Sequence, residues 1–497
     1  NSARQTIPPH GAAPDQTIVT PEAAIKKALG STPTVKIFSP RVTGSISLVG
    51  ARFHDLTLEG YRETIEPASE KVTLLRPLGI DNSYYAYFGW RANDNTEVPA
   101  FDANWTTDHR KLTPDTPMTL NWRNESGVLF QQVISLDNNY MFTVKQRVIN
   151  NSNKPIDVSP FGQIVRRGTP DVLDFYILHE GLLGVFNGIL KEVDYDDLQD
   201  SNPKYISNEK STGGWIGITD KYWLTALIPD QKAVSQTHFV GFSDGGRSPV
   251  DNYLVDFTGS PMVVGAGAQD EATNRLFAGA KEAQLILDYR DNLKISRFDL
   301  AIDWGWFEWL TKPLFFALVY FTKFLGNMGL SILLITVIIK LLFFPLANKS
   351  YRAMAKMKAL QPEMLKIRER FGEDRVRMNQ EMMALYKKEK ANPASGCLPI
   401  IPQIPVFFAL YKVVFVTIEL RHAPFFGWIK DLSAADPLSF VNLFGLIPWT
   451  PPEYMVIGIW PLIMGATMYF QQKLNPPPPD PTQAKIFMFL PFIFTIM

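Results

Sequence analysis

Few residues in this sequence of 497 residues have the types and the spacing that catalysis requires. The six histidines are isolated, and no HxH or HExxH pair places two of them at a metal-binding spacing. The charged segments Asp108 to Arg110 and Glu192 to Asp200 have the character of solvated loops rather than of a general acid and base. We therefore expect no catalytic residue, no metal site and no cofactor, and we expect that the protein is not an enzyme.

The residue that most needs an explanation is Lys340, which lies in a run without any other charge from Phe324 to Asn348. A bilayer core requires about 20 apolar residues in a helix, so this run is expected to cross a membrane. A lysine at the centre of such a helix costs about 2.5 to 3.5 kcal/mol. The flexible side chain either extends so that its ammonium group reaches the lipid headgroups, or it faces a water-filled interior. The sequence alone does not decide between these two alternatives.

Other polar residues accompany Lys340 in the expected spans. Thr336 lies one turn earlier on the same face, and the next expected span contains Gln403 near one end and Lys412 near the other. Polar groups on several spans form a wet cavity if they face one another. No carboxylate occurs inside these spans, which disfavours a coupled transporter because proton and cation relays use Asp or Glu.

Two parts of the chain must position these residues. Residues 31–300 have short apolar runs between turn clusters, and FTVKQRVI at residues 142–149 alternates with one polar exception, which predicts a large antiparallel β-sandwich of the supersandwich kind. The later part predicts an α-helical polytopic membrane domain. Residues 303–326, rich in tryptophan, are expected to form an amphipathic helix in the membrane interface. Spans are expected at residues 328–346, 398–418, 456–474 and, truncated, 486–497.

Charge predicts the orientation of these spans. Residues 347–396 carry twelve basic and six acidic side chains, so the positive-inside rule places this loop in the cytoplasm. The sandwich then lies on the other side, which in a bacterial inner membrane is the periplasm. We expect residues 1–30 to be a flexible linker that follows a membrane anchor missing from this sequence.

The basic loop is expected to be a cytoplasmic helical hairpin, with helices at residues 349–371 and 374–390 and a break at Gly372. Its apolar side is rich in methionine. Methionine surfaces adapt to varied partners, but packing between the two helices explains the pattern as well. The candidate contact residues are Met354, Met357, Met364, Met382 and Met383.

From Trp304 to Met497 the sequence resembles the YidC membrane protein insertase family, in its Gram-negative branch. The resemblance rests on QPEM, QEMMALYKKEKANP, GCLP, QIPVFFALY and IKDLSAADP. It implies spans around a hydrophilic groove, in which Lys340 corresponds to the family's positive residue, usually arginine, and Thr336 and Gln403 fall at groove-lining positions.

The resemblance also implies the activity and the partners. The expected function is to insert nascent inner-membrane proteins and, as a chaperone, to help them fold, alone or with the Sec translocon and its accessory subunits. The ribosome or signal-recognition components and membrane lipids are further expected partners, without nucleic-acid specificity. The alternatives are a transporter or channel with a periplasmic binding domain, which needs a continuous polar path, and a membrane-bound carbohydrate enzyme, which needs a catalytic set in the sandwich.

Overall fold

The chain is described from a computed structural model. It describes residues 21–496 except 31, 81, 173–176, 201–204, 243–250, 391, 393–399, 435, 437, 440, 442, 444, 445, 448–456 and 475–480. Several expected segments lie partly outside the described residues. They are the first 20 residues of the linker, residues 391 and 393–396 of the basic loop, the starts of the spans at 398 and 456, and residue 497.

Two large β-sheets form the first part of the chain. The larger sheet has 11 strands, with β13-β16-β17-β10-β5-β3-β2-β1-β6 as its main path, β18 beside β10 and β4 beside β3. All its pairs are antiparallel except the short pair of β1 with β6. Its strands are β1 (Thr34–Phe38), β2 (Val42–Ser47), β3 (Arg52–Arg62), β4 (Lys71–Leu75), β5 (Tyr84–Ala92), β6 (Lys111–Leu112), β10 (Ile156–Arg167), β13 (Tyr205–Thr212), β16 (Val234–Phe242), β17 (Asn252–Gly259) and β18 (Met262–Val264).

The second sheet has eight strands in the order β12-β11-β14-β15-β19-β9-β8-β7, and every neighbouring pair is antiparallel. Its strands are β7 (Met118–Arg123), β8 (Val128–Leu136), β9 (Met141–Asn150), β11 (Gly181–Phe186), β12 (Ile189–Asp194), β14 (Trp215–Thr219), β15 (Trp223–Ile228) and β19 (Gln269–Ala280). The two sheets enclose a core of buried aliphatic and aromatic side chains. The expected large β-sandwich is therefore confirmed.

The polar exception in the alternating segment 142–149 is part of this core. Gln146 on β9 is fully buried. Its side-chain nitrogen donates to the Gly89 carbonyl at 2.6 Å, and its side-chain oxygen accepts from the Asn274 amide at 2.8 Å. An amide whose two groups are both bonded can be buried at little cost, so the inward alternation of β9 continues without a break.

The other regular elements of the described residues are helices and 3₁₀ turns. They are α1 (Pro21–Gly30), α2 (Tyr195–Asp200), α3 (Ala283–Asn292), the 3₁₀ turn η2 (Phe298–Ala301), α4 (Glu308–Leu325), α5 (Met328–Phe371), α6 (Arg375–Lys388), α7 (Ile400–Val416), the 3₁₀ turn η4 (Ile418–Leu420), α8 (Ile459–Leu474) and α9 (Pro481–Ile496). By length and composition, α5 is the one helix in the described residues that is long and apolar enough to cross a membrane. Shorter apolar helices occur at Ile401–Val416 and Phe487–Ile496.

Three local expectations were wrong. Residues 21–30 of the expected linker form α1, because PEAAIKKALG has proline at the first helical position followed by strong helix formers. The acidic run from Glu192 forms the end of β12 and then α2 rather than a loop. The basic loop does not begin with a separate helix, because α5 continues without a break from Met328 to Phe371 and includes Pro345 and Pro362. The second hairpin helix does begin as expected, since Asp374 caps α6 by accepting from the Arg377 N–H at 3.0 Å.

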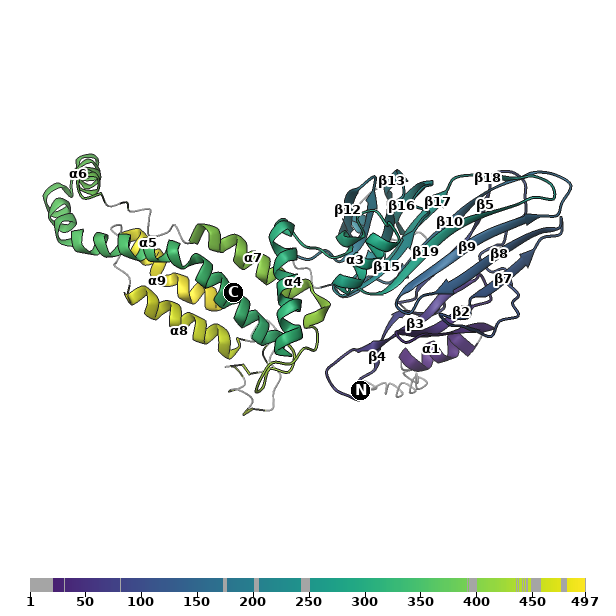
Figure 1. The fold of residues 1–497 in the computed structure, drawn as a ribbon, viewed down its shortest axis with the longest axis horizontal. Helices are drawn as coiled ribbons and strands as arrows, with labels where there is room; N and C mark the ends of the chain where they lie inside the picture. Colours follow the sequence, from purple (N-terminus) through teal and green to yellow (C-terminus); the bar gives the residue numbers. More distant parts are fainter. Residues whose placement is uncertain are drawn as a thin grey trace, which may run out of the picture.

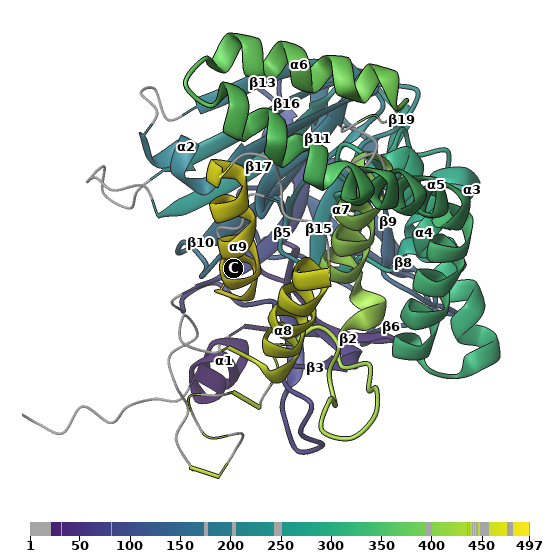
Figure 2. The ribbon, with the colours of Figure 1, turned by 90° about the vertical axis from the view of Figure 1, so that its left-hand side faces the viewer.

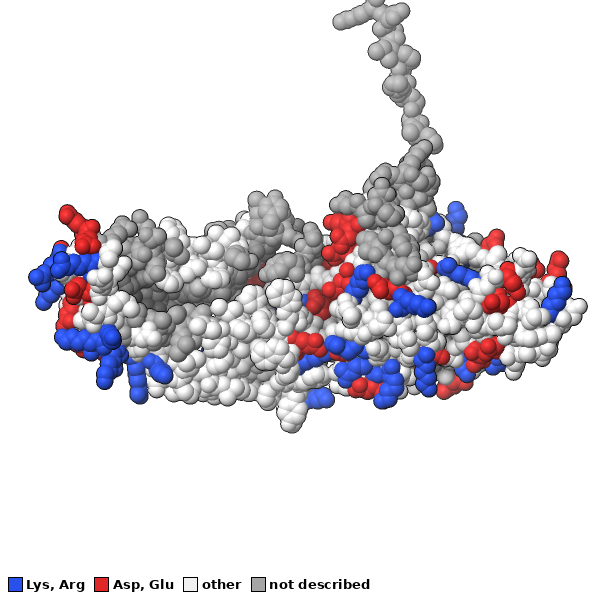
Figure 3. Space-filling model, turned by 90° about the horizontal axis from the view of Figure 1, so that it is seen from above, with Lys and Arg blue, Asp and Glu red and all other residues white. Residues whose placement is uncertain are grey.

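The sandwich and the helical part lie at opposite ends of an elongated molecule (Figure 1). Figure 2, seen from the helical end, shows α5, α7, α8 and α9 in front of the sheets. In Figure 3, Lys and Arg gather at the far end of the helical part, and an uncharged band separates them from the charged surface of the sandwich. On the face drawn, the described residues of this band have the uncharged surface that a bilayer core requires.

Candidate functional site

Lys340 lies on the apolar half of α5, about 18 Å along the axis from its first residue. Asn327 fixes this start, because its side chain accepts a hydrogen bond from the Leu330 N–H at 3.0 Å. The Lys340 side chain is exposed, and the described part of the chain offers it no hydrogen bond or ion pair. The ammonium group is thus available to bind a ligand, because no described group of the protein pairs with it.

Thr336 lies one turn from Lys340 on the same face of α5. Its hydroxyl is half-buried and donates to the Ile332 carbonyl at 2.8 Å, so its oxygen can still accept a hydrogen bond. Gln403 is exposed in the first turn of α7 and, within the described residues, forms no hydrogen bond. The three expected groove residues are therefore accessible, but Gln403 shares no hydrogen bond with the other two.

One end of the face that carries Lys340 is covered. Gly329 is 11 residues before Lys340, which places it about 20° away around the helix. It is buried against the ring of Phe425, so closely that a β-carbon on Gly329 would lie 2.2 Å from a ring carbon. The segment after α7 thus packs on the start of α5, whereas the same face is exposed about three turns later at Lys340.

The methionines of the hairpin divide into two groups. Met354, Met357, Met364 and Met382 are half-buried, whereas Met383 is 64 % exposed. The Tyr386 hydroxyl, on α6, lies 3.9 Å from the Met364 sulfur, on α5. Packing between the two helices therefore accounts for Met364, and Met383 offers an accessible apolar side chain at the basic end of the molecule.

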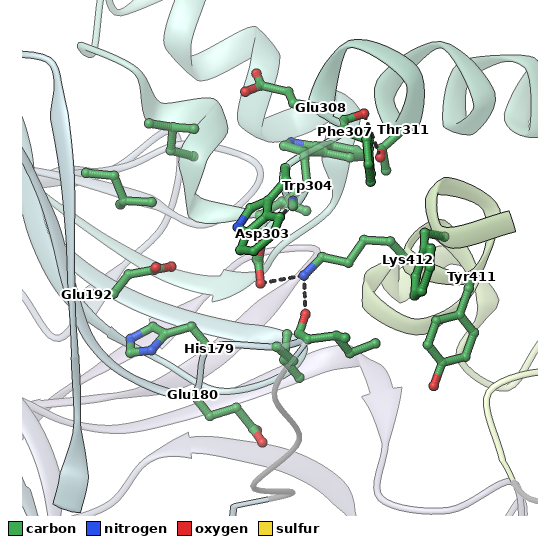
Figure 4. A pocket seen from close by; sticks show the side chains of 18 of the residues that line it. His179, Glu180, Glu192, Asp303, Trp304, Phe307, Glu308, Thr311, Tyr411 and Lys412 are labelled. Atoms are coloured by element: carbon green, nitrogen blue, oxygen red, sulfur yellow. Dashed lines mark hydrogen bonds and ion pairs between the residues drawn. The ribbon is translucent and has the colours of Figure 1, made fainter. Parts of the chain in front are cut away.

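Lys412, which the sequence marks only as a polar residue in a span, pairs with a distant carboxylate. Its ammonium group lies 2.5 Å from an Asp303 carboxylate oxygen and also donates to the Ile177 carbonyl of the sandwich. Figure 4 shows both contacts. The stem of Lys412 runs past Gly305, whose φ of 71° is in the left-handed region that favours glycine. The sequence gives no signal for this pair, because its partners are 109 residues apart.

A cavity of about 1050 Å³ lies where the sandwich, the segment before α4 and α7 meet. Its wall combines aromatic and aliphatic side chains with the carboxylates of Glu180, Glu192, Asp194, Asp196, Asp197, Asp303 and Glu308. Burial raises the pKa of Glu192, and Asp303 raises it further, while His179 and Lys412 oppose this shift. In the described residues no three His, Cys, Asp or Glu side chains are placed to hold a metal ion.

Two further residues after α7 attach the helical part to the sandwich. The Glu419 carboxylate accepts the Ala283 N–H at the start of α3 at 3.0 Å. Arg421 donates to the Arg62 carbonyl at 2.6 Å, and its guanidinium carbon lies 5.3 Å from the centre of the Trp223 ring. Together with Lys412 they form a polar junction between α7 and the sandwich.

This junction should respond to pH through Glu419. Burial raises the pKa of Glu419 to about 7, and its second oxygen has no partner among the described residues. The folded state therefore holds a proton that the unfolded chain releases at lower pH, so this stabilisation is complete below about pH 4.5 and is lost as pH rises through 7. Its size is at most about 3 kcal/mol.

We therefore expect the thermal unfolding midpoint of the purified protein in detergent to fall between pH 5 and pH 8. Glu419→Gln, which is neutral at every pH, should flatten this profile. Glu125→Gln, at an exposed turn of the sandwich, is the matched control and should leave the slope as it is. If the unfolding midpoint of Glu419→Gln depends on pH as strongly as that of the unaltered protein, another titratable group causes the pH dependence.

Comparison with known proteins agrees with this architecture. Residues 34–317 match the family described as YidC periplasmic domain, and residues 320–497 match the family described as 60Kd inner membrane protein. The chain is 48 % identical over 501 residues to a protein named membrane protein insertase YidC from Methylobacterium sp. (strain 4-46), covering 99 % of this chain and 80 % of that protein. The protein of the same name from Bradyrhizobium diazoefficiens is 49 % identical over 495 residues, covering 96 % and 79 %.

Among solved structures, a galactose mutarotase-related enzyme from Lactobacillus acidophilus is similar to half of this chain. It covers 50 % of this chain and 97 % of its own, with 9 % identity and a TM-score of 0.35. A likeness of this degree supports no inference about activity. The two family matches and the extent of the identity, by contrast, are decisive: the chain belongs to the YidC family of membrane protein insertases of Gram-negative bacteria.

Proposed function

We propose that this insertase receives the polar segment of a nascent inner-membrane protein at a groove lined by Lys340, Thr336 and Gln403. The observation that carries the proposal is the accessible, unpaired ammonium group of Lys340 on the longest apolar helix of the described chain. Among the residues described, no protein group competes for this charge. An acidic tail or loop would therefore find there a polar position partway across the bilayer.

The proposed path follows from the accessible faces of the helices. The apolar segment of the substrate would slide along the exposed apolar side chains of α7 and α9, such as Phe407 and Phe492. Its polar segment would remain in contact with the groove until it passes the covered end at Phe425. No step of this path requires a cofactor, because burial of the apolar segment supplies the driving force.

The proposed orientation places the basic hairpin in the cytoplasm and the sandwich in the periplasm. Twelve basic and six acidic residues between positions 347 and 396 support it. The helical part would then cross the inner membrane several times, with α4 in the outer interface, where Trp306 and Trp309 are 97 % and 72 % exposed. The hairpin, with Met383, would meet the ribosome or signal-recognition components, and the spans would meet lipids, the Sec translocon and its accessory subunits.

The alternative of a transporter or channel loses support at Lys412. A continuous path needs accessible polar groups at its outer end, and Lys412 was the candidate. Its ammonium group is instead held by Asp303 and the Ile177 carbonyl, and the residue is 9 % exposed. It closes a junction between domains rather than lining an open path.

Depletion of the protein in living cells tests the proposed function. Insertion of small ATP synthase c-type or phage-coat-type membrane proteins should fail, and re-expression of the full-length protein should restore it. Protection of the translocated segment against added protease measures insertion. Unchanged insertion after depletion would contradict the proposal.

A further inference from the structure

Helix α4 packs against both helices that carry the proposed groove residues, α5 and α7. A polar contact lies near each of its ends. Asp303, five residues before the start of α4, holds Lys412 of α7. Thr322, in the last turn of α4, holds Ser331 of α5.

The contact with α5 is buried. The Thr322 hydroxyl lies 2.9 Å from the Ser331 oxygen and 2.8 Å from the Leu318 carbonyl oxygen, and Ser331 in turn donates to the Asn327 carbonyl at 3.1 Å. Ser331 is 0 % exposed. A hydroxyl pair in an apolar surrounding is directional, whereas the apolar contacts beside it allow helices to slide and rotate.

The contact with α7 is stronger because it joins opposite charges. Asp303 accepts from Lys412 at 2.5 Å, and the Ile177 carbonyl occupies a second donor of the same ammonium group. Ile404, Phe408 and Lys412 are spaced four residues apart along α7, and all three line the cavity between α7 and the sandwich. Figure 4 shows Lys412 in this cavity. The Lys412 end of this face of α7 is thus fixed toward the sandwich.

The spacing of these residues links the contacts to the groove. Ser331 and Lys340 are nine residues apart on α5, and Gln403 and Lys412 are nine residues apart on α7. Nine residues correspond to about two and a half turns, so each groove residue faces about 180° away from the residue that α4 holds. Fixing one face of each helix therefore fixes the direction of the other.

We propose that α4 and the segment before it set the rotation of α5 and α7 and thereby aim Lys340 and Gln403 into the groove. Asp303 and Lys412 are the positioning residues for α7, and Thr322 and Ser331 are the positioning residues for α5. The assignment of the groove residues rests on the proposed function, but the rotation of each helix is a property of the protein without substrate. It can be measured separately.

The test is a thiol-modification profile of the full-length protein in lipid nanodiscs, with Cys397 replaced by serine. Single cysteines are placed at positions 337 to 340 of α5 and at 401, 403, 404 and 406 of α7, and their rates with a water-soluble maleimide are compared. Lys412→Met keeps the length of the stem and removes the charge. Thr322→Val keeps the shape and removes the hydroxyl. Both substitutions make a helix more apolar, so neither disfavours its partition into the membrane.

Lys412→Met should lower the ratio of the fastest to the slowest modification rate on α7 by about tenfold. The modification rates on α5 should not change. Thr322→Val should lower this ratio on α5 and leave the modification rates on α7 unchanged. Lys412→Arg, which keeps the cation, should restore the α7 profile. Lys323→Met, which removes an exposed lysine next to Thr322, is the matched control and should alter neither profile.

Two results would overturn the positioning role: an unchanged α7 profile in Lys412→Met, or equal changes in both helices in either variant. If the modification rate in the protein without these substitutions is highest at a position other than 340 or 403, the groove assignment is contradicted. The positioning role of α4 is not affected by that result.

Discussion

Lys340→Ala should slow the insertion of substrates with acidic translocated segments by about tenfold or more. At about 4 Å and an effective dielectric constant of about 20, one pair of opposite charges is worth about 4 kcal/mol, and each 1.4 kcal/mol lost corresponds to a tenfold change. Lys340→Arg keeps the charge and should retain most of the activity. Lys340→Glu should be more severe than alanine, because it repels the same segments. Protease protection of the translocated segment measures the effect.

The choice of substrate supplies the control for this prediction. A substrate whose translocated segment has no acidic residue should tolerate Lys340→Ala with little change. Leu342→Ala changes a 73 % exposed residue about 200° around the same helix and should affect both substrates equally little. If both substrates tolerate Lys340→Ala, the side chain serves only to reach the headgroups, as ordinary snorkelling lysines do.

Gly329→Leu should be the second severe change. A β-carbon at Gly329 already lies 2.2 Å from one ring carbon of Phe425 and 2.9 Å from two others, so a whole side chain must displace the segment after α7. Overpacking of this kind costs about 1 to 3 kcal/mol. We expect a lower thermal midpoint and strongly reduced insertion, because the covered end of the Lys340 face would open.

A compensating substitution separates this mechanism from a general defect of α5. Alanine favours a helix over glycine by about 1 kcal/mol, so a destabilising Gly329→Ala would point to the contact rather than to the helix itself. Removal of the ring in Gly329→Leu with Phe425→Ala should recover part of the lost stability. Full activity of Gly329→Leu alone would show that the contact has no role in insertion.

Local patterns predicted the β-strands well, because alternation follows directly from burial on one face. Gln146 shows the limit of the pattern. Its burial depends on the Gly89 carbonyl and on Asn274, which lie 57 and 128 residues away along the chain. The pattern gave β9 correctly despite this residue, since a single satisfied amide does not change the period of a strand.

The long helix α5 shows where local signals mislead. Charged residues after Asn348 suggested the end of one element, but a change from apolar to charged residues breaks no backbone hydrogen bond. Pro345 and Pro362 lie inside the helix, and their local signal to stop is overridden. Gly372, by contrast, does follow the end of α5, and Asp374 does open α6.

The candidate site was predictable in part. Lys340 and Thr336 stand out because one charge and one hydroxyl interrupt an apolar run at helical spacing. The partners of Lys412 could not be found in this way, since Asp303 and Ile177 belong to other elements and meet it only in the folded chain. Long-range contacts of this kind determine which polar residue of a span is free and which is occupied.

Site-specific photo-crosslinking to a stalled nascent chain tests the central claim most directly. A photoreactive residue would be placed at position 336, 340 or 403, and at 342 as a control on the opposite side of α5. We predict that positions 336, 340 and 403 crosslink to the polar segment of the substrate, whereas position 342 reaches only lipid or the apolar segment. Equal crosslinking of the polar segment from position 342, or none from 340, would contradict the groove.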